Sequence, residues 1–310
     1  MSFSRERAFP KASLFFLLAA ALAVVFALAS GRRVRKTADV AGGRSGATAG
    51  FAHRGDSSRA PENTLEAFRL AGEGFWLEMD AHLTADGEAV VIHDATVDRT
   101  TDGRGRVRAT TLAELQRLDA GHNFIGERGG HPWRGRGVRV PALREVYREL
   151  PEAHVNVEVK TSTPGTEGEV VRVVHEAGAA GRTLIASGDH RRMVRLREEI
   201  RRAADGEPER LIPTSASARE IRVFFFASLL GLERLVPVRY AALQVPARHG
   251  PIPVVTRRFV RAAHARGVRM DVWTVNDEAG MRRLVALGVD GIMTDRPQTL
   301  RRVLGEKSRS

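Results

Sequence analysis

The chain has 310 residues and a formal net charge of +12 at pH 7, with 49 lysines and arginines against 37 acidic residues. Its length suits one large α/β domain and requires no second one. The first 50 residues hold eight basic and two acidic side chains, which places +6 of the charge near the N-terminus. We therefore expect no nucleic-acid partner. The absence of cysteine excludes disulfides and thiolate metal sites.

Residues 12–30 form a long apolar run in which only Ser13 and Ser30 are polar. At about 1.5 Å per residue, such a run can cross a hydrocarbon core about 30 Å thick. Ala27-Leu28-Ala29 also resembles a signal-peptide cleavage site, but the length of the run and the basic residues after it favour an uncleaved anchor. We predict a single-pass anchor in the cell membrane over residues 1–36 and a flexible linker over residues 37–49.

The stretch that follows, residues 51–94, has a strand, helix, strand pattern with polar residues where the apolar runs break. The segments 51–55 and 75–83 are the predicted strands. The helix between them is predicted to start with Asn63 as its N-cap. Asp86-Gly87 then predicts a β-hairpin that folds the chain back toward the end of the second strand.

The remaining chain alternates short apolar strands with amphipathic helices, which predicts a TIM (β/α)8 barrel over residues 50–303. Residues 95–139, rich in Arg, Gly and Thr, are predicted to be an insertion after the second strand. Residues 304–310 are predicted to be a disordered tail. The six further strands are expected at residues 154–160, 183–187, 210–215, 241–246, 268–276 and 290–295, with helices between them at 168–178, 191–203, 221–238, 257–267 and 278–288 and a last helix from Pro297.

Glu78 and Asp80 lie two residues apart on a predicted strand, so both side chains point to one face. Carboxylates in an apolar strand require a cation, and Glu158 and Lys160 form a similar pair on a later strand. Three carboxylates without a thiolate predict a hard divalent cation, Ca²⁺ or Mg²⁺. Lys160 is the sole lysine between positions 37 and 306, which indicates that this position requires a compact ammonium charge rather than a guanidinium. The alternative, carboxylates on a solvated face, fits poorly because parallel barrel strands have none.

Four short motifs occur in order within 42 residues: His53-Arg54-Gly55, Pro61-Glu62-Asn63-Thr64, Glu78-Met79-Asp80 and His93-Asp94. Together they resemble the glycerophosphodiester phosphodiesterase family, and the resemblance extends over residues 50–303. It implies hydrolysis of glycerol-based phosphodiesters. It further implies that the glycerol 2-hydroxyl attacks phosphorus and that water then opens the cyclic phosphate.

His53 and His93 are the predicted acid and base, because imidazole titrates near neutral pH and this reaction must both remove and supply a proton. The resemblance assigns the two histidines the same roles, without indicating which is the first base. Arg54 and Lys160, together with the cation, are predicted to bind the phosphate oxygens.

Three other residues stand near strand ends. Trp273 resembles the aromatic residue that packs on the glycerol side of the substrate in the family, and a plain core tryptophan is the alternative. His82 is in phase with Asp80 on the same strand and is a candidate supporting residue. Asp295 is predicted to cap the last helix.

The segment Ile221–Val238 is more apolar than an ordinary barrel helix requires, yet too short and too interrupted to span a bilayer. It suggests a membrane-dipping lid or a channel for an acyl chain. It also resembles the corresponding stretch of the membrane-bound lysophospholipase D branch, which implies lysophospholipid substrates. The alternative is a helix buried against the barrel or against a dimer partner, and the sequence does not determine the oligomeric state.

Two other functions compete with this hypothesis. A catalytically silent membrane lipid-binding barrel is disfavoured because no member of the predicted acid/base and ligand set is missing. Metal-dependent amide or phosphotriester hydrolases on the same fold usually begin with an H-x-H strand, which this chain lacks.

Overall fold

A ring of parallel strands forms the centre of the protein, whose computed structural model describes residues 47–160 and 163–307. The strand order is β5-β4-β2-β1-β10-β9-β6, and each neighbouring pair on this path is parallel. This is the TIM-barrel-like fold that the alternating pattern predicts. The strands on the path are β1 (Ala49–His53), β2 (Phe75–Leu83), β4 (Val155–Val159), β5 (Thr183–Ala186), β6 (Ala242–Pro246), β9 (Arg269–Trp273) and β10 (Gly291–Thr294).

Residues 214–215 close the ring between its two ends, through parallel bridges from Thr214 to β5 and from Ser215 to β6. The predicted strand over residues 210–215 is therefore reduced to these two bridges. Pro213 lies within the segment and has no backbone N–H to donate, which limits regular pairing there.

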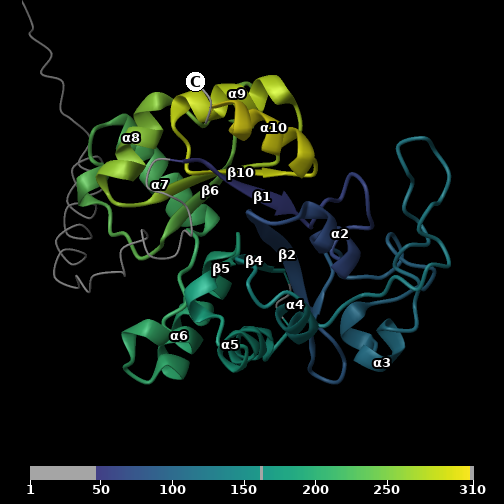
Figure 1. Ribbon diagram of the computed structural model, residues 1–310. Helices are drawn as coiled ribbons and strands as arrows, with labels where there is room; N and C mark the ends of the chain where they lie inside the picture. The colour runs from purple at the N-terminus through teal and green to yellow at the C-terminus, as the bar shows by residue number, and fades with distance from the viewer. Residues whose placement is uncertain (1–46, 161–162, 308–310) are drawn as a thin grey trace, which may run out of the picture.

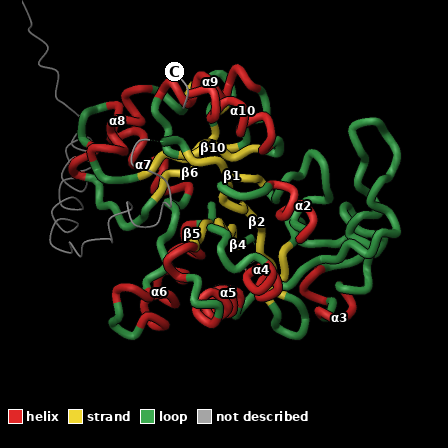
Figure 2. The backbone as a smooth tube through the Cα atoms, in the orientation of Figure 1, coloured by secondary structure: helices red, strands yellow, loops and turns green. Residues whose placement is uncertain are grey.

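Helices surround the strands on the outside (Figures 1 and 2). In α6, buried Met193, Leu196 and Ile200 recur every three or four residues and face the core, while the arginines between them are mostly exposed or half-buried. The helices are α2 (Leu65–Ala71), α4 (Leu143–Glu149), α5 (Thr166–Glu176), α6 (His190–Ala204), α7 (Ala218–Leu229), α8 (Arg257–Ala265), α9 (Glu278–Leu287) and α10 (Pro297–Lys307), with short 3-10 turns η3 (Ala180–Arg182), η4 (Pro208–Arg210) and η5 (Glu233–Leu235).

The chain between β2 and α4 forms a separate lobe beside the barrel (Figure 1). Strand β3 (Ala89–Val91) pairs antiparallel with β2, so the hairpin predicted at Asp86-Gly87 is confirmed. The 3-10 turn η2 (Val107–Ala109) and the short helix α3 (Leu112–Leu115) follow, and they share a small apolar core that is distinct from the main one. A second hairpin, β7 (Arg248–His249) with β8 (Ile252–Pro253), precedes α8.

Two further sequence expectations are wrong. The N-cap of α2 is Thr64, whose hydroxyl accepts a hydrogen bond from the Ala67 amide, and Asn63 instead has a left-handed backbone with φ of 60°. Helix α10 continues to Lys307, so residues 304–307 are helical rather than part of a disordered tail.

The predicted membrane anchor, residues 1–36, lies outside the described residues and stays a prediction, as do residues 37–46 of the predicted linker. Within residues 47–160 and 163–307, no helix combines the length and apolar character needed to cross a membrane.

The apolar segment 221–238 continues from α7 into η5 on the outer flank of the barrel, across the ring from α2 and α3 (Figure 1). Several of its large side chains are solvent-exposed, so it is not wholly buried against the barrel, and its roles as a lid or as an acyl channel stay predictions. Its exposed members are Val223, Phe226, Leu229, Leu230, Leu232 and Leu235.

Helix α7 has one buried face and one exposed face, and two of its phenylalanines allow this assignment to be tested. Phe224 is fully buried, with its ring centroid 6.1 Å from that of Phe259 in α8, whereas Phe226 is 61% exposed. We expect Phe224→Ala to lower the free energy of unfolding by about 3–5 kcal/mol and Phe226→Ala to change it by about 0.5 kcal/mol or less. Urea unfolding followed by circular dichroism measures both, and equal losses would contradict the assignment.

Candidate active site

Three carboxylates meet at the mouth of the barrel. Glu78 and Asp80 come from β2, all of whose residues are buried, and Glu158 comes from the adjacent strand β4, where it pairs in register with Asp80. One carboxylate oxygen from each residue lies within 4.8 Å of the others. The structure thus brings together the three residues that the sequence predicts as metal ligands.

This concentration of negative charge shifts the proton affinity of the carboxylates. Burial, and then the charge of Asp80, raise the pKa of Glu78 to about 8. For Asp80, burial also acts to raise the pKa, but the nearby cations Lys160 and Arg54 outweigh it and hold the pKa below its usual range. The ammonium Nζ of Lys160 lies 2.8 Å from Glu158 Oε2 and 3.2 Å from Asp80 Oδ1.

These carboxylates fit a hard divalent cation. Their donor atoms are all oxygens, and Asp80 Oδ1 is buried without a well-oriented hydrogen bond although Lys160 lies near it. A cation among the three groups would offset the repulsion that favours the protonated form of Glu78.

A tight turn after β1 aims Arg54 into this cluster. Arg54 and Gly55 both have positive φ, of 56° and 84°, and a side chain on Gly55 would come within 2.6 Å of the backbone of Ala67. In this conformation the Arg54 amide donates to Glu78 Oε2 at 3.0 Å, and its guanidinium Nε lies 3.1 Å from Asp80 Oδ2. The glycine of the first motif therefore permits the turn that places its arginine.

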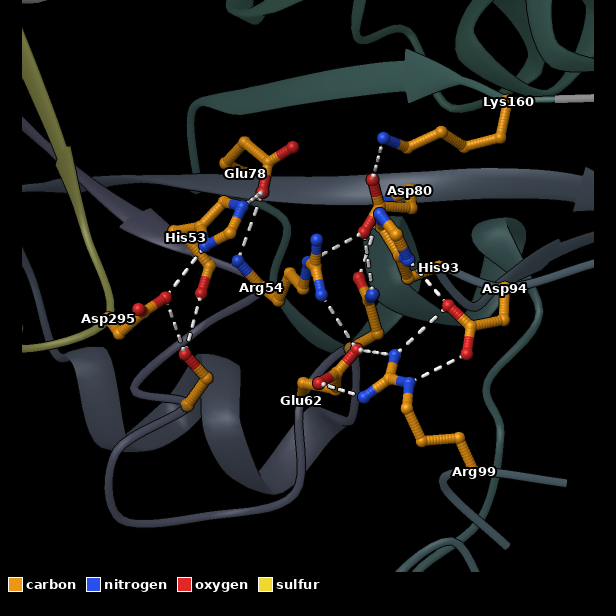
Figure 3. A network of polar contacts seen from close by, with 12 residues as sticks. His53, Arg54, Glu62, Glu78, Asp80, His93, Asp94, Arg99, Lys160 and Asp295 are labelled. Atoms are coloured by element: carbon orange, nitrogen blue, oxygen red, sulfur yellow. Dashed lines mark hydrogen bonds and ion pairs between the residues drawn. The ribbon is translucent and has the colours of Figure 1, made fainter. Parts of the chain in front are cut away.

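Each predicted catalytic histidine is held by a carboxylate through its Nδ1 atom (Figure 3). His53 Nδ1 lies 2.7 Å from Asp295 Oδ1, and His93 Nδ1 lies 2.6 Å from Asp94 Oδ1. His53 Nε2 then faces the cluster, 3.9 Å from Glu78 Oε2. Burial acts to lower the pKa of His53, but the hydrogen bond to Asp295 and the charge of Glu78 outweigh it, so the pKa is raised.

A second layer of charges links the two sides of the site (Figure 3). Arg99 donates from Nε to Asp94 at 2.6 Å and from both terminal nitrogens to Glu62, at 2.8 and 2.7 Å. Glu62 also accepts from Arg54 at 3.0 Å. The hydrogen bond from Arg99, together with that from His93, lowers the pKa of Asp94 to about 2. Asp94 is thus kept ionised as the partner of His93.

Residues 53–299 match the glycerophosphoryl diester phosphodiesterase family. The chain belongs to this family. It is 35% identical over 257 residues to a glycerophosphodiester phosphodiesterase of Caldanaerobacter subterraneus subsp. tengcongensis, a match that covers 81% of this chain and 95% of the relative. This membership makes the chain a phosphoric diester hydrolase that acts on glycerophosphodiesters.

Two further proteins are similar to this chain. The solved structure of an Oleispira antarctica phosphodiesterase, in complex with the product sn-glycerol-3-phosphate, shares 28% identity with this chain at a TM-score of 0.62 and covers 84% of this chain and 97% of its own. A lysophospholipase D of Rattus norvegicus is 24% identical over 286 residues, which is 83% of this chain and 86% of the relative.

The roles of several residues of this phosphodiesterase site were not predicted from the sequence. Asp295 does not serve as the predicted helix cap, because its carboxylate accepts from Ser57 and Asn276 and partners His53. Asn63 holds Asp80 through two hydrogen bonds, at 2.9 and 3.2 Å. Glu62 and Arg99 had no assigned role, although the four-residue motif containing Glu62 and Asn63 was a usable signal.

The two remaining candidates lie near the site. His82 Nε2 is 3.0 Å from the carbonyl oxygen of His93, which agrees with a supporting role. Trp273 is at the carboxyl end of β9 and 44% exposed, so it is not a buried core tryptophan, and its contact with substrate stays a prediction.

The pairing of Asp295 with His53 predicts a large loss of activity in Asp295→Asn. We expect kcat for glycerophosphodiester hydrolysis to fall by about 10²- to 10⁴-fold, because an amide cannot hold the Nδ1 proton or stabilise the imidazolium as a carboxylate does. A matched control is Asp290→Asn, which alters the pair of Asp290 with His264 at the start of β10. Similar kcat losses in both variants would contradict the assignment.

Proposed function

We propose that this phosphodiesterase is metal-dependent and that Glu78, Asp80 and Glu158 hold one Ca²⁺ or Mg²⁺. The observation that carries the proposal is the convergence of three carboxylates within 4.8 Å, two of them almost completely buried. When bound, the cation would stabilise negative charge that develops on the phosphate oxygens. The donor set does not discriminate between the two metals, because both prefer oxygen ligands.

The cationic side chains of the site would hold the phosphodiester in place. Arg54 and Lys160 already lie beside Asp80, on either side of the carboxylate cluster. Their charges would bind the non-bridging oxygens of the substrate and would favour the additional charge of the transition state. Trp273, at the end of β9, would pack against the glycerol part.

His53 and His93 would transfer the protons of the reaction through their Nε2 atoms. A carboxylate at Nδ1 favours the tautomer with its proton there, which leaves Nε2 of the neutral ring as a base. The protonated ring can return that proton at the same atom. One histidine would deprotonate the attacking glycerol hydroxyl while the other protonates the leaving alcohol, and the roles would reverse when water opens the cyclic phosphate.

Lysophospholipids are the second proposed substrate class. The similarity to a rat lysophospholipase D and the predicted N-terminal membrane anchor support this extension. Cleavage on the alcohol side of the phosphate would release a head group such as choline or ethanolamine. The competing proposal, a silent lipid-binding barrel, is disfavoured because both histidines keep carboxylate partners and all three predicted ligands converge.

Removal of the proposed ligands should affect metal binding and activity together. We expect Glu78→Gln and Glu158→Gln each to weaken divalent-cation affinity by at least about tenfold and to lower turnover, whereas Glu149→Gln, in a partly exposed ion pair with Arg69, should match the unmodified protein. Calorimetric titration of the chelator-treated protein with Ca²⁺ and Mg²⁺ measures affinity. Normal affinity and activity in both ligand variants would overturn the metal site.

Head-group release distinguishes the two substrate classes. We expect the detergent-solubilised protein to release choline from glycerophosphocholine and from lysophosphatidylcholine with Ca²⁺ or Mg²⁺, and not with a chelator. His53→Ala and His93→Ala should each lower the rate by about 10²- to 10⁴-fold at unchanged thermal stability. Release from the deacylated substrate alone would reject the lysophospholipid proposal, and undiminished rates in both variants would reject the acid/base assignment.

A further inference from the structure

Helix α7 exposes apolar side chains where other helices of the barrel expose charges. Arg222, Val223 and Phe226 are spaced so that they share one outward face, and Leu229 and Leu230 extend that face at the end of the helix. The opposite face buries Phe224 against Phe259 of α8. The helix therefore already packs on the barrel with one face, and the large apolar side chains of its second face are mostly exposed to solvent in the described structure.

The turn after α7 continues this apolar surface. Leu230, which is 73% exposed, is followed by exposed Leu232 and Leu235. Two arginines of the α8 region hold the turn in place: Arg258 donates from Nε to the Ser228 carbonyl at 2.6 Å, and Arg266 donates to the Arg234 and Val236 carbonyls at 2.9 and 2.8 Å. The exposed leucines are thus presented by a hydrogen-bonded turn. We call Val223, Phe226, Leu229, Leu230, Leu232 and Leu235 the apolar flank.

The same part of the chain is strongly basic. Residues 211–270 contain ten arginines, no lysine and two acids, a net +8, so the other residues after position 50 have a net charge of −2. Of the two acids, Glu220 is paired with Arg197 at 2.7 Å, and Glu233 is only partly exposed. Exposed arginines border the apolar flank both on α7 and in the turn, at positions 219, 222 and 234.

We propose that the apolar flank and its bordering arginines dock on an anionic lipid bilayer. Aliphatic and aromatic side chains enter the interfacial region of a membrane, and arginines around them bind the anionic head groups. A protein partner would not require so uniform a positive charge, and a nucleic acid would not favour exposed leucines. The apolar flank shares no residue with the catalytic site, and it lies across the ring from α2 and α3 (Figure 1). The proposal therefore does not depend on the substrate class.

The absence of native cysteine allows a direct test with the full chain. Leu230→Cys and, as a matched control, Val194→Cys on α6 would each be labelled with an environment-sensitive nitrobenzoxadiazole fluorophore. Val194 is also an exposed aliphatic residue, at 48%, but it lies on a helix whose outer face is charged. The labelled proteins would be mixed with phosphatidylcholine vesicles that contain or lack phosphatidylglycerol, and the label at position 194 reports any response that is not specific to the apolar flank.

We expect the label at position 230 to shift to shorter wavelength and gain intensity several-fold with phosphatidylglycerol vesicles, and less with phosphatidylcholine alone. The label at position 194 should change little. High salt should reduce the difference between the two vesicle types, because it screens the arginines. Combining Leu230→Cys with Arg222→Glu and Arg234→Glu should abolish that difference at unchanged thermal stability.

Three outcomes would overturn the proposal. The label at position 230 could remain in an aqueous environment with both kinds of vesicle, or the two labels could respond alike. A label at position 230 that is already shielded before lipid is added would instead assign the flank to a second copy or to another segment of this chain.

Discussion

Two carboxylates on the fully buried strand β2 impose the constraint on which the site depends. Glu78 and Asp80 cannot both be ionised at low energetic cost unless positive charge lies close by. Arg54 and Lys160 provide it for Asp80, and each directly follows a strand that adjoins β2 in the ring. Glu78 has the weaker compensation, so burial and the charge of Asp80 raise its pKa, and a divalent cation would fit beside it. The proposed cofactor thus follows from an imbalance of charge that the fold leaves at one point.

Around this cluster the two histidines have similar carboxylate support from different parts of the fold. His53 ends β1 and Asp295 directly follows the neighbouring parallel strand β10, and they meet because Ala52 and Thr294, the residues before them, pair in register. His93 and Asp94 are adjacent in sequence, and Arg99 orients their pair from the lobe that follows β3. The barrel therefore supplies one His–Asp pair and the lobe supplies the other. In the proposed mechanism, such an arrangement would place two proton-transfer groups beside the phosphate of the substrate.

The proposed membrane surface and the catalytic site lie on different parts of the same scaffold. Strand ends determine the site, because the carboxyl ends of all parallel strands in the ring open on one mouth. The outer faces of the helices do not contribute to the site. Their inner faces pack the helices in place, as Phe224 of α7 does against Phe259 of α8. This explains how α7 can carry an exposed apolar face without disturbing the residues around Glu78. The barrel allows the two surfaces to specialise independently.

The barrel pattern could be predicted from the sequence, and so could the candidate residues Glu78, Asp80, Glu158, His53 and His93, because two-residue alternation and strand ends are local features. The register of β2 with β4 then confirmed that the three carboxylates meet. The contact of Asp295 with His53 across 242 residues, and that of Asn63, with its left-handed backbone, with Asp80, became visible in the folded structure alone. The tertiary structure also decided that the apolar side chains of α7 face outward. Partners distant in sequence and the exposed face of a helix depend on how elements pack, which no local pattern specifies.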